Sequence, residues 1–235
     1  MKVAVVMIAW NQVQYTRWCL SSVLRNSGGH DVEFHLLDNG STDGQTYAAL
    51  ESVKPVTLSR NERNESVYRG WNRVLAEALK RPCDVICLLS NDVVVGPGWL
   101  DGIAREVAKP DLRYLLPNGE WPEQVETFDE TVRAALPGLV GQTKPGLAAW
   151  CMFFKPEAVR IFHPIPEDFI LWYGDNYIHL ALREKGYAGV AVMDCCAIHF
   201  LSKTFFATPG YTNIVEDDKR AFNILAQKRG WEQVP

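Results

Sequence analysis

Short apolar runs that alternate with helix-like segments constrain this fold more than any other feature of the chain. The runs VAVVMIAW (3–10), VEFHLLD (32–38) and DVICLLS (84–90) are nearly continuous in apolar residues, as expected for buried strands. Between them, the segments 15–24 and 65–80 have apolar residues at helical spacing. This alternation predicts parallel βαβ units, and therefore an α/β fold with a Rossmann-like, mostly parallel sheet flanked by helices.

The pattern weakens in the middle of the chain and then returns. Five prolines punctuate 110–145, which we interpret as a mobile excursion that holds a helix at 123–136. Regular elements follow, with strands at 148–154 and 189–195 and helices at 176–185 and 213–229. A length of 235 residues fits one domain of this kind better than two.

Composition and the apolar runs disfavour several classes of protein. The formal net charge of −4 disfavours a broadly basic surface for nucleic acid or anionic lipid. Six cysteines without paired CxxC spacing favour reduced thiols and a cytoplasmic location. The opening apolar run lacks a small-residue cleavage site, which indicates a buried strand rather than a signal peptide. No run approaches the roughly 20 apolar residues that span a bilayer, so we expect no transmembrane segment.

Polar residues directly follow the apolar runs. In open parallel sheets, ligands bind beyond the carboxyl ends of the strands, so these residues are the first candidates for a site. They are Asn11, Asp38, Asn39, Ser90, Asn91, Asp92 and His199. The sequence therefore predicts a binding site at the carboxyl edge of the sheet.

The two carboxylates among these residues, Asp38 and Asp92, each have a functional and a structural interpretation. Asp38 ends an apolar strand, where it can accept hydrogen bonds from a ribose or a base edge; the alternative is an Asx turn or a cap. Asp92 lies where a buried strand opens to solvent and offers the oxygen ligand that a hard divalent cation requires. Its alternative is a turn before Pro97 and Gly98. The residues alone leave both choices open.

His199 and Asp175 also have two interpretations. Imidazole suits manganese-like ions, so His199 can complete a metal site, although a lone histidine after a strand is more often structural. Asp175 lies in the aromatic loop FILWYGDNY, which can hold a carboxylate against a substrate hydroxyl as a general base. Its alternative is a helix N-cap, a position that Asp175 or Asn176 fits well.

The order of seven sequence segments carries more weight than any single motif. The segments are IAWNQVQYTRWCLSSVL, LLDNGSTDGQT, NESVYRGWNRVLAEAL, ICLLSNDVVVGPGWL, AAWCMFFKPEAV, EDFILWYGDNYIHLALREKGY and AIHFLSKT. The middle segments combine an asparagine-containing helix, an apolar strand, Asn91-Asp92 and a Pro-Gly-Trp-Leu turn. In this order the chain resembles the family 2 glycosyltransferases, in particular their rhamnosyltransferase-like branch, up to about Phe205.

The resemblance implies a GT-A nucleotide-sugar fold and a role for each matching residue. It places the donor beside Asn11, Asp38, Asn39, Asn72, Ser90 and Asn91. Ser90-Asn91-Asp92 takes the position of the family's DXD-type motif, and Asp92, with His199 nearby, would hold Mn²⁺ or Mg²⁺. Asp175 matches the carboxylate that serves as catalytic base.

The same resemblance divides the single domain into functional parts. It implies a nucleotide-sugar-binding half at 1–109, the excursion at 110–145, an acceptor and catalytic half at 146–205, and a C-terminal helical part at 206–235. The implied reaction is inverting transfer of a sugar from a nucleotide diphosphate to an acceptor hydroxyl. The acceptor stays open among a saccharide, a lipid-linked saccharide, a protein, a small molecule and a modified nucleobase.

Three positions depart from the family pattern. Gly174 replaces one member of an acidic pair, Tyr177 replaces another commonly acidic residue, and Ser90 replaces the first residue of the metal motif. A noncatalytic nucleotide-sugar-binding protein is therefore an alternative. A nucleotidyltransferase is a further alternative from the same fold class, but no N-terminal glycine-rich phosphate loop supports it.

Overall fold

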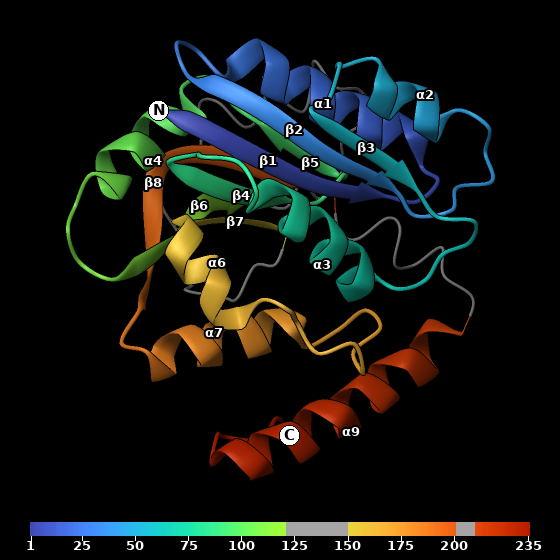
Figure 1. Cartoon of the computed structure of the whole chain (residues 1–235), viewed down its shortest axis with the longest axis vertical. Helices are drawn as coiled ribbons and strands as arrows, with labels where there is room; N and C mark the ends of the chain where they lie inside the picture. Colours follow the sequence, from blue (N-terminus) through green and yellow to red (C-terminus); the bar gives the residue numbers. More distant parts are fainter. Residues whose placement is uncertain (121–149, 201–209) are drawn as a thin grey trace.

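Eight strands form one sheet in this computed structural model, which describes residues 1–120, 150–200 and 210–235. Their order across the sheet is β3-β2-β1-β4-β7-β6-β8-β5 (Figure 1). The strands are β1 (Lys2–Ala9), β2 (Asp31–Asp38), β3 (Thr57–Arg60), β4 (Val85–Leu89), β5 (Val93–Val95), β6 (Arg113–Glu120), β7 (Cys151–Phe154) and β8 (Ala188–His199). The α/β class predicted from the sequence is confirmed.

The strands from the first half of the chain are parallel. β1 pairs with β2 and β4, and β2 pairs with β3. In these ladders Ala9 lies opposite Asp38, and Asp38 lies opposite Arg60. The carboxyl ends of neighbouring strands therefore meet at one edge, where such sheets bind ligands. The rest of the sheet is mixed, because β7 is antiparallel to β4 and β6, β6 is parallel to β8, and β5 is antiparallel to β8.

Helices cover both faces of the sheet (Figure 1). They are α1 (Val13–Asn26), α2 (Thr46–Glu51), α3 (Val67–Ala78), α4 (Trp99–Val107), α6 (Pro156–Phe162), α7 (Gly174–Glu184) and α9 (Tyr211–Arg229). Along β1, Val3, Val5 and Met7 pack in one apolar cluster with α1 and α4. Ala4 and Val6 pack in a second cluster with α3, α6, α7 and α9. This alternation explains why β1 is apolar from Val3 to Ala9, since both of its faces are covered.

The predicted helices at 15–24, 65–80 and 213–229 correspond to α1, α3 and α9. The prediction was wrong for 113–120, which is strand β6 rather than an irregular excursion. β6 is held by parallel pairing with β8, and its register shifts between Pro117 and the next residue. Proline cannot donate a ladder hydrogen bond, so such irregular positions tolerate it and hide the strand in the sequence. The remainder of the expected excursion, including the helix at 123–136, lies outside the described residues.

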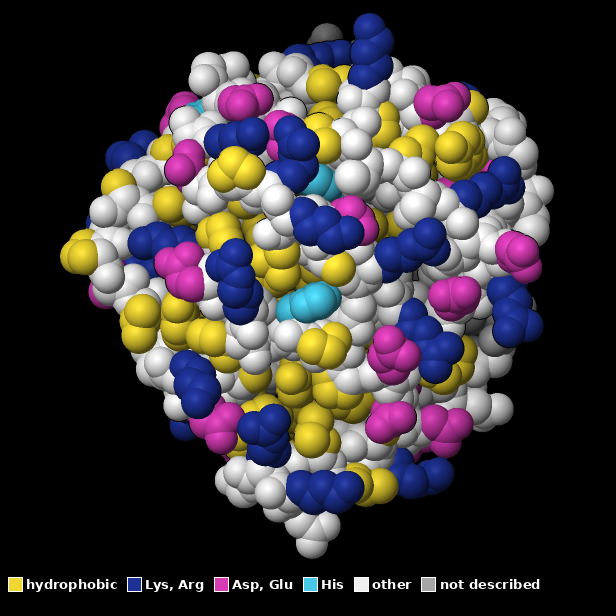
Figure 2. Space-filling model, viewed as in Figure 1, with side chains coloured by type: hydrophobic (Ala, Val, Ile, Leu, Met, Phe, Trp, Pro, Cys, Tyr) yellow, Lys and Arg dark blue, Asp and Glu magenta, His cyan; other side chains and the backbone are white. Residues whose placement is uncertain are grey.

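The described surface carries both charge signs. On the face shown in Figure 2, basic and acidic side chains are interspersed, with hydrophobic side chains visible between them. This distribution agrees with the absence of a strong net positive charge in the composition. Within the described ranges, the helices are all too short or too polar to cross a membrane. Cys19, Cys87, Cys151 and Cys195 are fully buried, where a thiol packs as a small apolar group.

Candidate active site

Asn11 joins the loop after β1 to the loop after β2. Its backbone is left-handed, with φ of 52°. The backbone N–H of Asn11 donates to Oγ of Ser41 at 2.8 Å, and its side-chain Oδ1 accepts from the backbone N–H groups of Thr42 at 2.8 Å and Asp43 at 3.2 Å. Asn11 therefore shapes the Asn-Gly-Ser-Thr-Asp-Gly loop at the carboxyl edge of the sheet.

Asp38 is fully buried at the end of β2. Its Oδ1 accepts from the backbone N–H of Ser41 at 2.8 Å, and its Oδ2 lies 3.1 Å from Nε of Arg60. Arg60 also donates from Nη2 to the carbonyl of Ser41 at 3.0 Å. The turn-forming bond expected of the structural interpretation is thus present. No local pattern singles out Arg60, because its role depends on its place opposite Asp38 in β3.

Asn39 connects the loop after β2 to the segment that leads into α3. Its Nδ2 donates to Oδ1 of Asn64 at 3.0 Å and to the carbonyl of Ser66 at 3.2 Å, and its Oδ1 accepts from Nδ2 of Asn61 at 2.8 Å. Gly40 follows with φ of 77°, and a Cβ there would lie 2.3 Å from a backbone carbon of Arg63. Glycine is therefore required where these two segments touch.

Asp92 and His199 meet in space although they are far apart in the sequence. Asp92 precedes β5 and His199 ends β8, and Val93 lies opposite His199 in the ladder of these two strands. Oδ1 of Asp92 lies 3.2 Å from Nε2 of His199, and both side chains are almost completely buried. The ring of Trp150 stacks on the imidazole at a centroid distance of 5.4 Å and an interplanar angle of 10°. Trp150 thus fixes the plane of the histidine ring.

The two residues before Asp92 are held by hydrogen bonds to α1 and to Trp150. Asn91 donates from Nδ2 to Oγ1 of Thr16 at 2.9 Å, which ties the end of β4 to α1. Ser90 receives a hydrogen bond from Sγ of Cys19 to its carbonyl, and its N–H donates to the carbonyl of Trp150. These bonds hold the backbone that presents Asp92.

The Asp92–His199 pair suits a hard or borderline divalent cation. It combines one carboxylate oxygen with one imidazole nitrogen, a donor set suited to Mn²⁺. Mg²⁺ and Mn²⁺ in nucleotide enzymes take few protein ligands and fill the other positions with water and phosphate oxygens. Among the described residues, no group of three or more His, Cys, Asp and Glu side chains gathers as a closed metal cage. The residues present fit an open site of this kind.

Asp175 lies in the first turn of α7, which begins at Gly174. The N-cap is Tyr173, with φ of 64°, so the expectation that Asp175 or Asn176 is the N-cap was wrong. Oδ1 of Asp175 instead accepts from the backbone N–H of Asn176 at 2.9 Å. Although the residue keeps some exposed surface, burial of its carboxyl raises the pKa of Asp175 above its ordinary value. A carboxylate with a raised pKa has the properties of a general base.

Tyr68 occupies the space beside Gly174. A Cβ on Gly174 would lie 2.0 Å from Cε1 of the Tyr68 ring. The Tyr68 hydroxyl accepts from the N–H of Gly174 at 2.9 Å and donates to the carbonyl of Leu171 at 3.1 Å. Burial, followed by the negative charge of Asp175, raises the pKa of Tyr68 well above its ordinary value. The ring of Tyr68, which belongs to α3, therefore occupies the space that an acidic side chain at position 174 would need.

Asn72 is the one predicted donor residue that the described contacts do not join to the strand-end loops. Both of its amide atoms bond the backbone of Ile165: Nδ2 donates to the carbonyl and Oδ1 accepts from the N–H, each at 2.8 Å. This bidentate pair fastens α3 to the segment after α6. The geometry supports a role in holding that segment.

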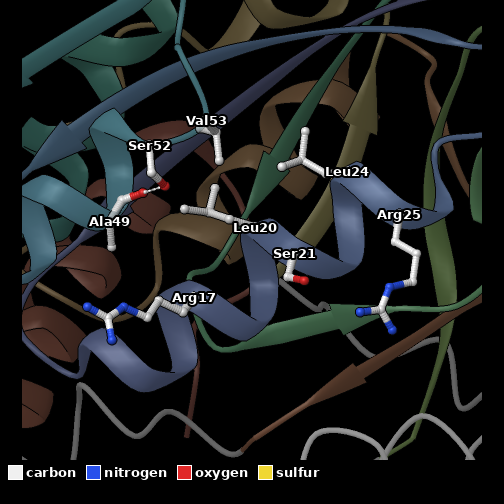
Figure 3. A pocket seen from close by; sticks show the side chains of 8 residues that line it. All are labelled: Arg17, Leu20, Ser21, Leu24, Arg25, Ala49, Ser52 and Val53. Carbon is white, nitrogen blue, oxygen red and sulfur yellow. Dashed lines mark hydrogen bonds between the residues drawn. The ribbon is translucent and has the colours of Figure 1, made fainter.

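A separate cavity of about 410 Å³ lies between α1 and α2, away from the predicted site residues. Leu20, Leu24 and Val53 point into the space between the two helices, and Arg17 and Arg25 lie toward its ends (Figure 3). Arg17 also donates to Oε1 of Gln45 at 3.3 Å. This cavity contains none of the carboxylates or histidines discussed above.

Comparisons with solved structures show which proteins share this fold. A mannosyltransferase of Pyrobaculum calidifontis, in complex with GDP-Man and Mn²⁺, matches 99% of this chain and 65% of its own with a TM-score of 0.65 and 16% identity. Staphylococcus aureus TarS matches 97% of this chain and 39% of its own with a TM-score of 0.69 and 14% identity. GalNAc-T7, in a structure with UDP, GalNAc and Mn²⁺, matches 92% of this chain and 48% of its own with a TM-score of 0.64 and 14% identity. The chain thus spans less than two thirds of the length of each.

Sequence comparison supplies the family. No curated protein matches the chain. The model of glycosyl transferase family 2 matches residues 4–163, which is more than half of the chain and includes every strand-end loop of the parallel half. The match and the shared fold identify this protein as a glycosyltransferase of family 2 with the GT-A fold.

Proposed function

We propose that the protein is an inverting, metal-dependent glycosyltransferase that uses a nucleoside diphosphate sugar. The observation that carries this proposal is a continuous set of contacts between the strand-end loop and the segment that leads into Asp175. Asn39 bonds the carbonyl of Ser66, and the next residue, Val67, donates its N–H to the carbonyl of Ile170 at 2.9 Å. The loop after β2 and the segment that leads into Asp175 are thereby held against the same N-terminus of α3, which supports a donor side and an acceptor side next to each other.

On the acceptor side, Asp175 takes the proton of an acceptor hydroxyl. The oxygen forms a bond to the anomeric carbon while the bond from that carbon to the diphosphate breaks, and the electron pair leaves with the diphosphate. A positioned base of this kind contributes about 10² to 10⁴-fold in rate. The raised pKa of Asp175 supports this role, because a more basic carboxylate takes a proton more readily.

On the donor side, the loop shaped by Asn11, Asp38 and Asn39 would receive the nucleoside, and Ser90 and Asn91 would hold the backbone next to the diphosphate. Asp92 and His199 are the residues that would hold Mn²⁺ or Mg²⁺. A divalent cation there supplies charge neutralisation for the leaving diphosphate. The Mn²⁺ in two of the similar structures supports the choice of manganese as the first ion to test.

A nucleotide-sugar screen tests the proposal. The set begins with GDP-mannose and UDP-sugars, because the similar proteins were solved with GDP-Man or UDP. Thermal stabilisation should appear for one nucleotide class and should require Mn²⁺ or Mg²⁺, since a ligand that binds only the native state raises its stability. Stabilisation by none of these donors with either ion would overturn the proposal.

A noncatalytic nucleotide-sugar-binding protein is the second candidate. The observation that favours it is the Tyr68 ring at Gly174, which leaves no room for a second carboxylate beside Asp175. Hydrolysis of the donor in the presence of Mn²⁺ separates the two, because an enzyme releases nucleoside diphosphate slowly to water whereas a binding protein does not. A cytoplasmic location is part of the proposal, whereas the acceptor stays open among the five classes named above.

A further inference from the structure

Three consecutive backbone N–H groups before α7 converge on one carboxylate from the far end of the chain. Oδ1 of Asp218 accepts from Ile170 at 2.8 Å, and Oδ2 accepts from Leu171 and Trp172 at 2.7 Å each. Asp218 belongs to α9 and is fully buried. Its neighbour Asp217 has a side chain that is 65% exposed, so burial is specific to Asp218 on this helix.

A buried carboxylate is retained at such a place only when its charge is well compensated. Burying an ionised group is strongly unfavourable unless hydrogen bonds or an opposite charge satisfy it. Successive backbone N–H groups that turn toward one point form a concave site for an anion, and hydrogen bonds to a charged acceptor are stronger than neutral ones. Asp218 therefore holds the backbone of residues 170–172 more strongly than an apolar contact with the helix would.

The same short segment is fastened on its opposite side by α3. Val67 donates its N–H to the carbonyl of Ile170, and the Tyr68 hydroxyl bonds the carbonyl of Leu171 and the N–H of Gly174. Tyr173, which carries the left-handed backbone before α7, stacks on Phe222 of α9 with a centroid distance of 5.6 Å. Every residue from 170 to 174 is thus fixed by α3 or α9, and the next residue is Asp175.

We propose that Asp218 is a positioning residue that sets the carboxylate of Asp175 toward the acceptor, and that α9 is thereby part of the acceptor side of the enzyme. This inference rests on the proposed role of Asp175 as the base. Both residues lie beyond the residues 4–163 that match the family model, so the match assigns neither of them a role. Misplacement of a reacting group by about 1 Å can cost about 10²-fold in rate, which is why a rigid segment before the base matters.

The test compares Asp218→Asn with Asp217→Asn, two substitutions that remove the same charge from the same helix. Asp218→Asn replaces one of the two acceptor oxygens by an amide NH₂ group, which cannot accept from a backbone N–H. It should therefore speed hydrogen exchange at the amides of 170–172 about ten-fold or more. It should also lower the pKa of Asp175 toward its ordinary value, because a loosened segment admits water to the carboxyl. Asp217→Asn should change neither quantity.

Both quantities can be measured without an acceptor. Exchange is followed by mass spectrometry, and the pKa of Asp175 is followed by a carbon-detected NMR titration, with Asp175→Asn identifying the resonance. The affinity for UDP and GDP with Mn²⁺ should be the same in all variants. Unchanged exchange and an unchanged pKa in Asp218→Asn would overturn the proposal.

A second variant separates positioning from the loss of a charge or from a failure to fold. Tyr68→Phe keeps the ring beside Gly174 but removes the hydroxyl that bonds the segment from the α3 side. It should also speed exchange at the segment and lower the pKa of Asp175, with no change in formal charge. If Tyr68→Phe leaves both unchanged, the segment does not control Asp175. If these effects appear but Asp175→Asn still transfers sugar normally, the assignment of the base fails and the positioning of Asp175 stands.

Discussion

The imidazole Nε2 of His199 lies 3.2 Å from Oδ1 of Asp92, so the ends of two strands present one oxygen and one nitrogen to the same point. We expect Asp92→Asn to abolish the Mn²⁺ dependence of donor binding while the protein stays folded, because an amide oxygen carries no full charge for the ion. Turnover should fall by about 10²-fold or more, which corresponds to several kcal/mol of lost charge stabilisation. Calorimetry with the donor, with and without Mn²⁺, is the measurement.

Asp101→Asn, at an exposed carboxylate that is hydrogen-bonded to His30, is the matched control. Donor affinity with an unaltered metal dependence in Asp92→Asn would remove Asp92 from the metal site.

Replacement of Asp175 by Asn should reduce sugar transfer by about 10²-fold or more and leave donor binding near normal, because the amide cannot take a proton. Neither Asp175 nor Asn176 is the N-cap, so loss of a cap does not complicate the comparison. Initial rates of transfer with a fixed donor and Mn²⁺ are the measurement. Near-normal transfer in this variant would move the search for a base to Glu167 and Asp168.

The same substitution should change stability in a pH-dependent way. Burial raises the pKa of Asp175 in the folded state, whereas in the unfolded chain the pKa keeps an ordinary value of about 3.9. Between these two values the folded protein holds a proton that the unfolded chain has released, so stability falls as pH rises through this window. Asp175→Asn has no such charge. Its melting temperature relative to that of the wild type should therefore be higher at neutral pH than near pH 4, and a constant difference across this range would contradict the raised pKa.

A side chain at Gly174 should destabilise the protein through Tyr68. The Cβ of Gly174→Ala would lie 2.0 Å from the Tyr68 ring, and overpacking of this kind costs about 1 to 3 kcal/mol. In a Tyr68→Ala background the same change should cost much less, because the ring is absent. The four proteins of this double-mutant cycle are compared by urea unfolding. Additive losses in the double variant would show that the two positions do not interact.

Asp38→Ala should lower both stability and affinity for the free nucleoside diphosphate. It leaves the buried N–H of Ser41 without its acceptor, at a cost of about 1 to 3 kcal/mol, and it releases Arg60 from its ion pair. Because the proposed contact is to the nucleoside side, UDP or GDP alone should bind more weakly, and not only the sugar-bearing donor. Arg60→Gln is the control for loss of the ion pair alone, because it keeps Asp38 and removes its charged partner. An effect confined to the sugar-bearing donor would contradict the assignment.

The sequence could predict the parallel half of the fold because its signals are local. β1, β2 and β4 are apolar runs, and Asp92 and His199 could be selected because each follows such a run. Three features escaped this approach. β6 contains Pro117, and its pairing with β8 is non-local. Asp218 is one acidic residue in a polar helix, which is typical of a solvent-exposed position. The fit between Tyr68 and Gly174 joins segments with no shared pattern in the sequence.

The pairing of β5 with β8 has a consequence for how the molecule assembles. β5 directly follows Asp92, and its ladder partners in the described part of the chain are Ala197, Ile198 and His199. Pairing β5 with β8 closes the long loop between Val95 and Ala197. Closing such a loop costs chain entropy before any contact compensates for it, and non-local strand pairs slow folding for the same reason. The parallel pairs β1–β2 and β2–β3 close much shorter loops, as between Lys2 and Asp31 or between His35 and Thr57. We therefore expect the corner that holds Asp92 and His199 to be among the last parts of the sheet to form. A nascent chain that has not yet reached β8 would have the parallel half of the sheet without the proposed metal-binding pair.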